Sequence, residues 1–327
     1  MRVLVTGATG FIGSHLVEKL LEQGYQLRCS VRKSSNLQWL KNLPIEFTFC
    51  DLINNIDIHQ SVKDVDFIYH VAGLTKARTK EEYFRGNHIA TKNLLIAARE
   101  VNPGLKRFVH ISSGAAVGPG SADCIVTEDT PFHPITTYGI SKMEAEKECR
   151  KLMTELPITI VRPPAVYGPR DKDIFEFFNT MNKGLQPMVG FTDKFVSLIH
   201  IHDLVRGTIL AGEHPSAIGK TYFISSEKYY DWKEVGKVTA RVMKKKALRL
   251  RIPEAGIYLI AAFSEIVSLI NRKPALINFE KARDMVQSHW TFDITRAKTE
   301  LGFREEYSLE EGIKNTVDWY RNQGWLA

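Results

Sequence analysis

Apolar residues follow two different rhythms in the first half of the chain. Short, almost uninterrupted apolar runs alternate with longer stretches in which apolar residues return every three or four positions. The first rhythm predicts strands buried on both faces, and the second predicts helices. Strands that alternate with helices predict an α/β fold built on a doubly wound parallel sheet. The expected strands are residues 3–5, 26–31, 45–50, 67–71, 107–112 and 158–162, and the expected helices are residues 12–23, 82–101 and 138–155.

A glycine-rich turn, TGATGFIG at residues 6–13, joins the first expected strand to the first expected helix. Gly7 permits a tight turn, Gly10 lets the backbone approach a pyrophosphate, and Gly13 allows close packing of helix on strand. The start of the helix favours anions, because its amide groups and its dipole point there. The sequence therefore predicts a dinucleotide site of the Rossmann type.

After residue 165 the alternation becomes irregular, and only residues 195–202 and 221–225 have the pattern of further strands. We expect a Rossmann-type domain that binds the nucleotide and a smaller, mainly C-terminal lobe that binds the substrate. The predicted nucleotide domain is residues 1–165 with roughly 195–226, and the predicted lobe is residues 166–194 and 227–327.

Tyr138 and Lys142 lie four residues apart, which is about one helical turn, so both side chains emerge on one face. A phenol has a pKa of about 10 and is a poor acid or base at neutral pH. A neighbouring ammonium favours the phenolate and lowers that pKa. We therefore expect Tyr138 to exchange protons near neutral pH.

The composition is that of an ordinary soluble globular protein, with 44% hydrophobic and 25% charged residues. The net charge is +7, but no long basic run with interleaved aromatic residues indicates a nucleic-acid partner. The four cysteines are scattered without CxxC spacing, and the first strand begins at residue 2. These features predict no metal site, no signal peptide and a cytoplasmic protein.

Residues 255–270 are almost entirely apolar, with Glu265 as the one interruption. Basic residues flank the stretch: Lys244–Lys246, Arg249 and Arg251 before it, and Arg272 and Lys273 after it. It is shorter than the roughly 20 residues of a membrane-spanning helix. We expect a buried helix of the substrate lobe; the alternatives are an interfacial helix on anionic lipid or the wall of an apolar pocket.

Several short motifs, in order along almost the whole chain, resemble those of the extended short-chain dehydrogenases/reductases. The stretch around Arg32 further resembles the dihydroflavonol-reductase and 3-beta-hydroxysteroid-dehydrogenase-like branch. The matching motifs are TGATGFIG at 6–13, HVAG at 70–73, FVHISS at 108–113, YGISK at 138–142, RPPAVYGP at 162–169, HIHD at 200–203 and the segment 293–303.

This resemblance implies a catalytic triad of Ser113, Tyr138 and Lys142. Tyr138 would transfer the substrate proton, and Lys142 would lower the pKa of the tyrosine and bind the nicotinamide ribose. Ser113 would hold the carbonyl oxygen as charge develops on it. Ser112 is the neighbouring candidate, and the alternation of side chains along a strand lets only one of the two serines face the site.

The resemblance also implies a set of cofactor-binding residues and a homodimer packed through residues 82–101 and 138–155. Asp51 and Leu52 would lie at the adenine, and Asn87 is either a cofactor residue or a structural hydrogen-bonding residue. The full set is Thr6, Gly7, Thr9, Gly10, Phe11, Ile12, Gly13, Arg32, Lys33, Asp51, Leu52, Val71, Ala72, Gly73, Asn87, Tyr138, Lys142, Pro163 and Val166.

The end of the second expected strand favours NADP over NAD. Enzymes that prefer NAD usually carry an acid there for the ribose 2′-hydroxyl, whereas this chain carries Arg32 and Lys33 and no acid. A guanidinium pairs well with a 2′-phosphate.

We therefore expect an NADP-dependent oxidoreductase that reduces a ketone or oxidises a secondary alcohol of a small, apolar or ring-bearing substrate. Sugar dehydration is unlikely from the sequence, because Gly114–Val117 provides no acid pair after the serine. Two alternatives remain: a nucleotide-sugar epimerase with tightly bound NAD, and a non-catalytic nucleotide-binding scaffold.

Overall fold

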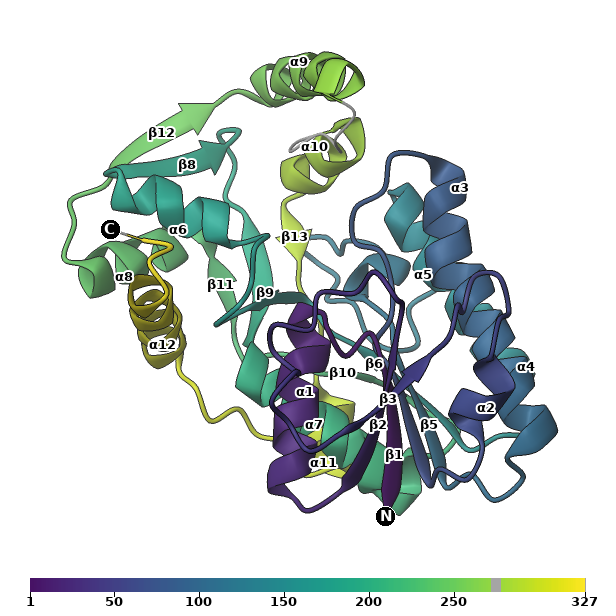
Figure 1. The fold of residues 1–327 in the computed structure, drawn as a ribbon. Helices are drawn as coiled ribbons and strands as arrows, with labels where there is room; N and C mark the ends of the chain where they lie inside the picture. Colours follow the sequence, from purple (N-terminus) through teal and green to yellow (C-terminus); the bar gives the residue numbers. More distant parts are fainter. Residues whose placement is uncertain (272–277, 327) are drawn as a thin grey trace.

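The computed structural model describes residues 1–271 and 278–326, and its main element is a parallel sheet (Figure 1). Within the described residues this sheet has seven strands in the order β10–β6–β5–β4–β1–β2–β3. The order reverses between β1 and β4, which makes this point the topological switch of a doubly wound fold. The strands are β1 (Arg2–Thr6), β2 (Gln26–Val31), β3 (Glu46–Phe49), β4 (Phe67–His70), β5 (Arg107–Ile111), β6 (Ile158–Arg162) and β10 (Thr221–Phe223).

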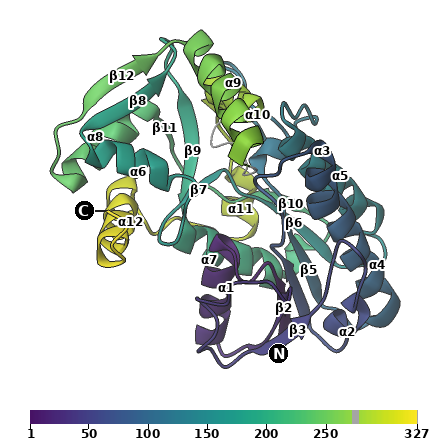
Figure 2. The ribbon, with the colours of Figure 1, turned by 45° about the horizontal axis from the view of Figure 1, so that its top comes forward.

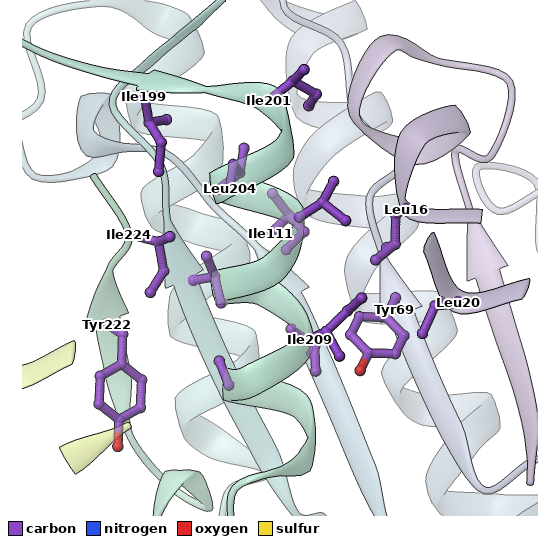
Figure 3. Close-up of a cluster of buried hydrophobic side chains, with 14 of the residues drawn as sticks. Leu16, Leu20, Tyr69, Ile111, Ile199, Ile201, Leu204, Ile209, Tyr222 and Ile224 are labelled. Carbon is purple, nitrogen blue, oxygen red and sulfur yellow. The ribbon is translucent and has the colours of Figure 1, made fainter. Parts of the chain in front are cut away.

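Helices cover both faces of the sheet, as the near-continuous apolar strands require (Figure 1). One face is covered by α1 (Phe11–Glu22), α7 (Ile201–Glu213) and α11 (Thr295–Glu300), and the other by α2 (Ile58–Val62), α4 (Ala90–Val101) and α5 (Thr137–Lys151). The core under α1 and α7 is aliphatic with buried tyrosines (Figure 3). Its labelled members are Leu16, Leu20, Tyr69, Ile111, Ile199, Ile201, Leu204, Ile209, Tyr222 and Ile224.

The expected helix at residues 82–101 is present, but its first part is not regular. It starts as α3 (Lys80–Tyr83), passes through the π-helical turn η1 (Phe84–Ile89) and continues as α4. A π-helical turn inside a helix re-aims the side chains that it carries. Here it carries Asn87, one of the expected site residues.

The lobe rests on a small sheet and a separate strand pair. The sheet joins β11, β9 and β13, with β7 paired to β9, and the strand pair is β8 with β12. These strands are β7 (Ala165–Tyr167), β8 (Leu185–Val189), β9 (Phe195–His200), β11 (Tyr229–Asp231), β12 (Leu248–Ile252) and β13 (His289–Trp290). The helices are α6 (Phe175–Asn182), α8 (Trp232–Met243), α9 (Glu254–Asn271), α10 (Phe279–Val286) and α12 (Leu309–Asn322), and the two short 3₁₀ turns elsewhere are η2 (Gly114–Ala116) and η3 (Pro215–Ala217).

The boundary between domain and lobe differs in two places from the expected one. β9, within the segment 195–226, pairs in the small sheet, and in that segment β10 alone joins the large sheet. Phe292, Ile294 and Phe303 pack into the core under α7, although residues 227–327 were all expected in the lobe. The chain therefore crosses back to the large domain after β13, which sequence periodicity does not reveal.

The apolar stretch at residues 255–270 forms α9 and is buried on one side only. Ile257 and Ala261 are buried, whereas Leu259 and Phe263 are 72% and 70% exposed. The expectation of a buried helix is therefore wrong for its outer face. No described helix is both long and apolar enough to cross a membrane. Arg272 and Lys273, the basic residues expected after the helix, lie outside the described residues.

Candidate active site

The expected site segments all follow strands of the large sheet. The glycine turn follows β1, Arg32 follows β2, Asp51 follows β3 and Ser113 follows β5. Because the strands are parallel, their carboxyl ends lie at one edge of the sheet. Ligands of doubly wound sheets bind beyond this edge, at the switch point.

The glycine turn is held against the segment that follows β4. Gly7 has a φ of +69°, and a Cβ atom there would lie 2.6 Å from the amide nitrogen of Ala72. A Cβ atom on Gly13 would lie 2.1 Å from the carbonyl oxygen of Gly7. The close contact at Gly13 is therefore made with the glycine turn. Gly10 is the N-cap of α1 and provides no side-chain hydrogen bond to the helix. The first amides of α1 thus remain available to an anion.

Arg32 and Lys33 extend from the end of β2 with exposed side chains. Arg32 lies close enough to Asp51 to help lower the pKa of that carboxyl, together with hydrogen bonds from Asn54 and Ile53. Asp51 accepts from the amide nitrogens of Ile53 and Asn54 at 2.9 and 3.1 Å, so its carboxylate shapes the turn after β3. The ends of β2 and β3 therefore form one polar corner.

The structure distinguishes the two candidate serines. Ser113 lies beside Tyr138, and its hydroxyl favours the ionised phenol, which lowers the pKa of Tyr138. Ser112 points the other way and donates to the Glu146 carboxylate at 2.6 Å, in a buried position. Strand alternation thus turns Ser113 toward the tyrosine and Ser112 away from it, and the catalytic role of Ser113 stays a prediction.

Tyr138 lies in the first turn of α5, where Thr136 caps the helix by accepting from the Gly139 amide. Burial raises the pKa of Tyr138 to about 12; the neighbouring Ser113 hydroxyl opposes this rise, and the carboxylate of Asp284 adds to it. The expected lowering of this pKa is therefore not found. Burial outweighs it, because a phenolate loses more solvation than a phenol when water is removed.

Lys142 lies one turn after Tyr138, with its ammonium buried. The ammonium donates to the carbonyl oxygen of Ile111 at 2.6 Å. Burial lowers the pKa of Lys142 to about 8, while the carboxylate of Glu146 acts in the opposite direction. The side chain is therefore held in place by β5 and mainly charged at neutral pH.

Asn87 has a structural role that the sequence left open. Its side chain accepts from the Leu74 amide at 2.7 Å and donates to the hydroxyl of Ser141 at 2.8 Å. It thus ties the loop after β4 to α5. A Cβ atom on Gly73 would lie 3.0 Å from the Asn87 oxygen and 3.7 Å from the Lys142 nitrogen, so Gly73 keeps this corner open.

Thr6 also has a structural partner. Its hydroxyl shares a 2.7 Å hydrogen bond with His70, which bonds Thr91 on its other ring nitrogen at 2.8 Å. The remaining expected cofactor residues lie near the same edge in the chain segments after β1, β3, β4 and β6. They are Thr9, Phe11, Ile12, Leu52, Val71, Pro163 and Val166.

Two carboxylates near Tyr138 were not expected from the sequence. Glu280 in α10 accepts from the backbone amide of Thr137 and, at 3.1 Å, from its hydroxyl. Asp284, one turn later, has a side-chain oxygen that is buried and lacks a hydrogen-bond partner among the described residues. Burial raises the pKa of Asp284 to about 6. No local motif marks these residues, because they come from a distant helix.

A second unexpected feature lies behind the site. Glu146 is fully buried and binds the guanidinium of Arg162 through two hydrogen bonds of 2.9 and 2.7 Å. Together with Ser112 this pair fixes α5 against β5 and β6. Lys142 and Glu146 lie four residues apart on one helix face, and this spacing could have indicated from the sequence that Glu146 lies behind the site.

The aromatic residues of α6 do not form a wall of the site. Phe175 and Phe178 pack on Tyr320 with ring centroids 5.1 and 5.6 Å apart, and Phe177 packs on Trp232. They belong to the core of the lobe.

These residues fit a nicotinamide dinucleotide. The cradle at Gly7 would be filled by any Cβ atom, the start of α1 has no side-chain cap, and an exposed arginine follows β2. Chemically, Ser113, Tyr138 and Lys142 combine a hydrogen-bond donor, a neutral acid and a fixed cation at the same edge.

Comparison with known proteins agrees with this arrangement. Residues 3–225 match the family described as NAD dependent epimerase/dehydratase. The chain is 30% identical to the ceramide reductase of Caulobacter vibrioides, covering 99% of this chain and 96% of that protein. It is 27% identical to a 3-beta-hydroxysteroid dehydrogenase of Mycolicibacterium neoaurum, covering 98% and 91%.

A solved structure has the same fold over nearly its whole length. It is the UDP-glucuronic acid 4-epimerase from Bacillus cereus in complex with NAD, with a TM-score of 0.79, 25% identity and 99% coverage of both chains. The predicted resemblance to extended short-chain dehydrogenases/reductases is confirmed, and this chain belongs to the NAD dependent epimerase/dehydratase family.

Proposed function

We propose that the protein is an NADP(H)-dependent reductase of an apolar ketone, working in the reverse direction on the secondary alcohol. The observation that carries the proposal is the state of Tyr138: its ring is half-buried beside Ser113, and its raised pKa keeps the phenol neutral at neutral pH. A neutral acid is what the oxygen of a carbonyl group needs when the adjacent carbon is reduced.

The roles of the three residues follow from their positions. Ser113 holds the carbonyl oxygen, and its hydrogen bond strengthens as negative charge develops there. Tyr138 gives this oxygen its proton. The Lys142 ammonium, held by the Ile111 carbonyl, stabilises the tyrosinate that is left. The reduced nicotinamide, when bound, supplies the hydride.

The surroundings of Tyr138 favour an apolar substrate over an anionic one. The carboxylates of Asp284 and Asp173 act on the phenol beside the Lys142 ammonium. Asp173 is ion-paired with Lys76 at 2.5 Å, so it is mainly Asp284 that would repel a diphosphate. α10, which contributes Asp284, packs on the apolar helix α9. Ceramide and steroid, named in the descriptions of two relatives, are apolar molecules, which supports this substrate class.

The second candidate is a nucleotide-sugar epimerase with tightly bound NAD. It is supported by the close likeness of the fold to that of the UDP-glucuronic acid 4-epimerase. Such an enzyme would purify with NAD that dialysis does not remove, and it would convert a UDP-sugar without consuming added cofactor.

The test is a screen of ketones of graded size and chain length, following oxidation of NADPH and of NADH. We expect turnover with NADPH on apolar ketones. Tyr138→Phe should lower kcat at least about 100-fold, because the acid is lost. Tyr83→Phe is the matched control, since its ring lies 6.3 Å from that of Tyr138, and it should keep most activity. Full turnover by Tyr138→Phe would refute the proposal, and UDP-sugar conversion would favour the epimerase.

A further inference from the structure

Helix α9 has an apolar face on its outside as well as on its inside. Its inner face, with Ile257 and Ala261, packs on Ala282 of α10. Its outer face carries Leu259, Phe263 and Ile266, which are 72%, 70% and 57% exposed. These three residues are spaced by four and three positions, so they form one stripe along the helix. We call Leu259, Ile260, Phe263 and Ile266 the outer stripe of α9.

The outer stripe carries no charge, because the two acids of α9 have partners elsewhere: Glu254, the first residue of the helix, lies 3.6 Å from Lys194, and Glu265 contacts α10. Glu265 is the one charged residue between 255 and 271. Its carboxylate accepts from the backbone amide of Phe279 at 3.0 Å, at the start of α10. Glu265 thus holds α9 on α10 through its carboxylate, and the outer stripe is an exposed apolar surface.

Exposed cations lie immediately before this helix. Lys244, Lys245 and Lys246 are exposed between α8 and β12, and Arg249 and Arg251 are exposed in β12. Among the described residues, none of these five cations has an ion-pair partner within 4.0 Å. Two leucines of the same strand are also exposed: Leu248, before Arg249, by 71%, and Leu250, between the two arginines, by 47%.

β12 leads directly into α9 at the outer end of the lobe (Figures 1 and 2). Unpaired cations next to exposed leucine and phenylalanine side chains are the combination that binds to the interface of an anionic membrane. α9 has 18 residues, each of which adds about 1.5 Å to the length of the helix. A helix of this length can lie along such an interface with its outer stripe toward the lipid. It does not cross the bilayer, since no described helix is able to do so.

A second copy of this chain is a poorer occupant of the same surface. A symmetric contact through α9 would bring two such groups of five unpaired cations near each other, which costs free energy. The dimer expected from the family resemblance would instead use α4 and α5, which lie across the molecule from β12 (Figure 1). We propose that the outer stripe of α9, with the basic segment 244–251, docks the protein on the surface of a membrane that contains anionic lipid.

This docking would place the membrane close to the candidate active site. α10 packs between α9 and the start of α5, where Glu280 holds Thr137 and Asp284 acts on Tyr138. An apolar ketone dissolved in the bilayer would then have a short path to the phenol. This last step rests on the proposed function, whereas the docking itself does not.

The experiment is co-sedimentation of the full chain with vesicles of two compositions. One is phosphatidylcholine alone, and the other contains roughly one quarter phosphatidylglycerol, the anionic lipid. We expect binding to the second that is at least about tenfold stronger than to the first, and that weakens in about 0.5 M salt, where charges are screened.

Two pairs of variants test the residues. The double variant Leu259→Ser, Phe263→Ser should lose binding about tenfold or more, while Phe49→Ser, at another phenylalanine that is 51% exposed, should bind like the unchanged protein. Lys245→Glu with Lys246→Glu should abolish the preference for anionic vesicles, whereas Lys63→Glu with Lys92→Glu, at exposed lysines elsewhere, should keep it. A circular dichroism melt checks that each variant is folded.

Equal binding to the two kinds of vesicle, or equal binding by the α9 variant and the Phe49 variant, would overturn the docking proposal. So would a dimer in sedimentation that the α9 variant turns into a monomer, because a second copy would then cover the stripe. Turnover of a water-soluble ketone by the α9 variant separates this proposal from the reductase. Activity without vesicle binding contradicts docking alone, and vesicle binding without any ketone turnover contradicts the reductase alone.

Discussion

Arg32 and Lys33 follow β2 with exposed side chains, beside the turn that Asp51 closes after β3. The carboxylate of Asp51 already accepts hydrogen bonds from backbone amides. It is therefore poorly placed to form a direct ion pair with Arg32 in competition with a phosphate. A 2′-phosphate at this corner would meet a guanidinium that can form two parallel hydrogen bonds. At the scale of single residues, the proposed preference for NADP thus depends mainly on one side chain.

We expect Arg32→Asp to weaken NADPH binding about 10- to 100-fold, because a hydrogen bond to a charged group contributes about 1.5–3 kcal/mol. NADH should bind as well as before or better, since the new carboxylate can accept from a ribose hydroxyl. Fluorescence titration with both cofactors measures the change. Lys63→Asp, at an exposed lysine before β4, serves as the control. An unchanged ratio of the two affinities would remove Arg32 from this role.

Helix α5 is the element that carries the proposed acid, Tyr138, and a buried ion pair fixes this helix. Glu146 is fully buried and bonds both Ser112 of the loop after β5 and Arg162 of β6. Arg162 is also buried, and its guanidinium lies 5.4 Å from the ring centroid of Phe223. The pair therefore defines the depth and the rotation of α5, and with them the positions of Tyr138 and Lys142.

Replacing one partner should be costly, because the other charge would stay buried without its counter-ion. We expect Glu146→Gln to lower the free energy of unfolding by about 3–5 kcal/mol. Glu144→Gln, two residues earlier on the same helix, breaks a partly exposed pair with Lys147 and should cost less than about 1 kcal/mol. Urea unfolding of the two variants makes the comparison. Equal losses would mean that the buried pair does not fix α5.

At the scale of the whole molecule, four histidines of the described residues are buried in positions that disfavour their charged form. Burial lowers the pKa of His15, His70 and His200 to about 3, and lowers that of His110 well below its usual value. An unfolded histidine has a pKa near 6.5, so the unfolded chain takes up these protons first as the pH falls. The folded state therefore loses stability below about pH 6.5.

By pH 5 His15, His70 and His200 should each lower the free energy of unfolding by about 2 kcal/mol relative to pH 7. His110 should act in the same direction. Asp171 and Asp284 act in the opposite direction, because burial raises the pKa of both to about 6. Protonation of these two carboxyls in the folded state raises the free energy of unfolding by about 1 kcal/mol each. Urea unfolding at pH 7 and pH 5 should therefore show a net loss of several kcal/mol.

His110→Leu isolates one of these contributions, because neither ring nitrogen of His110 has a hydrogen-bond partner among the described residues. We expect this variant to be nearly as stable as the unchanged protein at pH 7 and to lose less stability than that protein on acidification. His70→Leu should already be destabilised at pH 7, since it breaks the bonds to Thr6 and Thr91. The same acid loss in His110→Leu and in the unchanged protein would contradict the assignment.

Local patterns were enough to predict the large sheet and to propose the residues of the candidate site. The strands 26–31 and 158–162 were predicted to the residue. The order of the motifs placed the glycine turn, Ser113, Tyr138 and Lys142 in one family. This worked because side-chain periodicity, turn chemistry and helical spacing are properties of neighbouring residues, so they can be read along the chain.

Only the tertiary structure could decide the properties that depend on distant segments. The pKa of Tyr138 is raised rather than lowered because residues from other elements bury it, and Asp284 reaches it from a helix almost 150 positions later. The same holds for β9 in the small sheet, for the return of Phe292 to the large core, and for the exposed side of α9. Desolvation and packing are set by what lies near in space, and sequence periodicity records only what lies near along the chain.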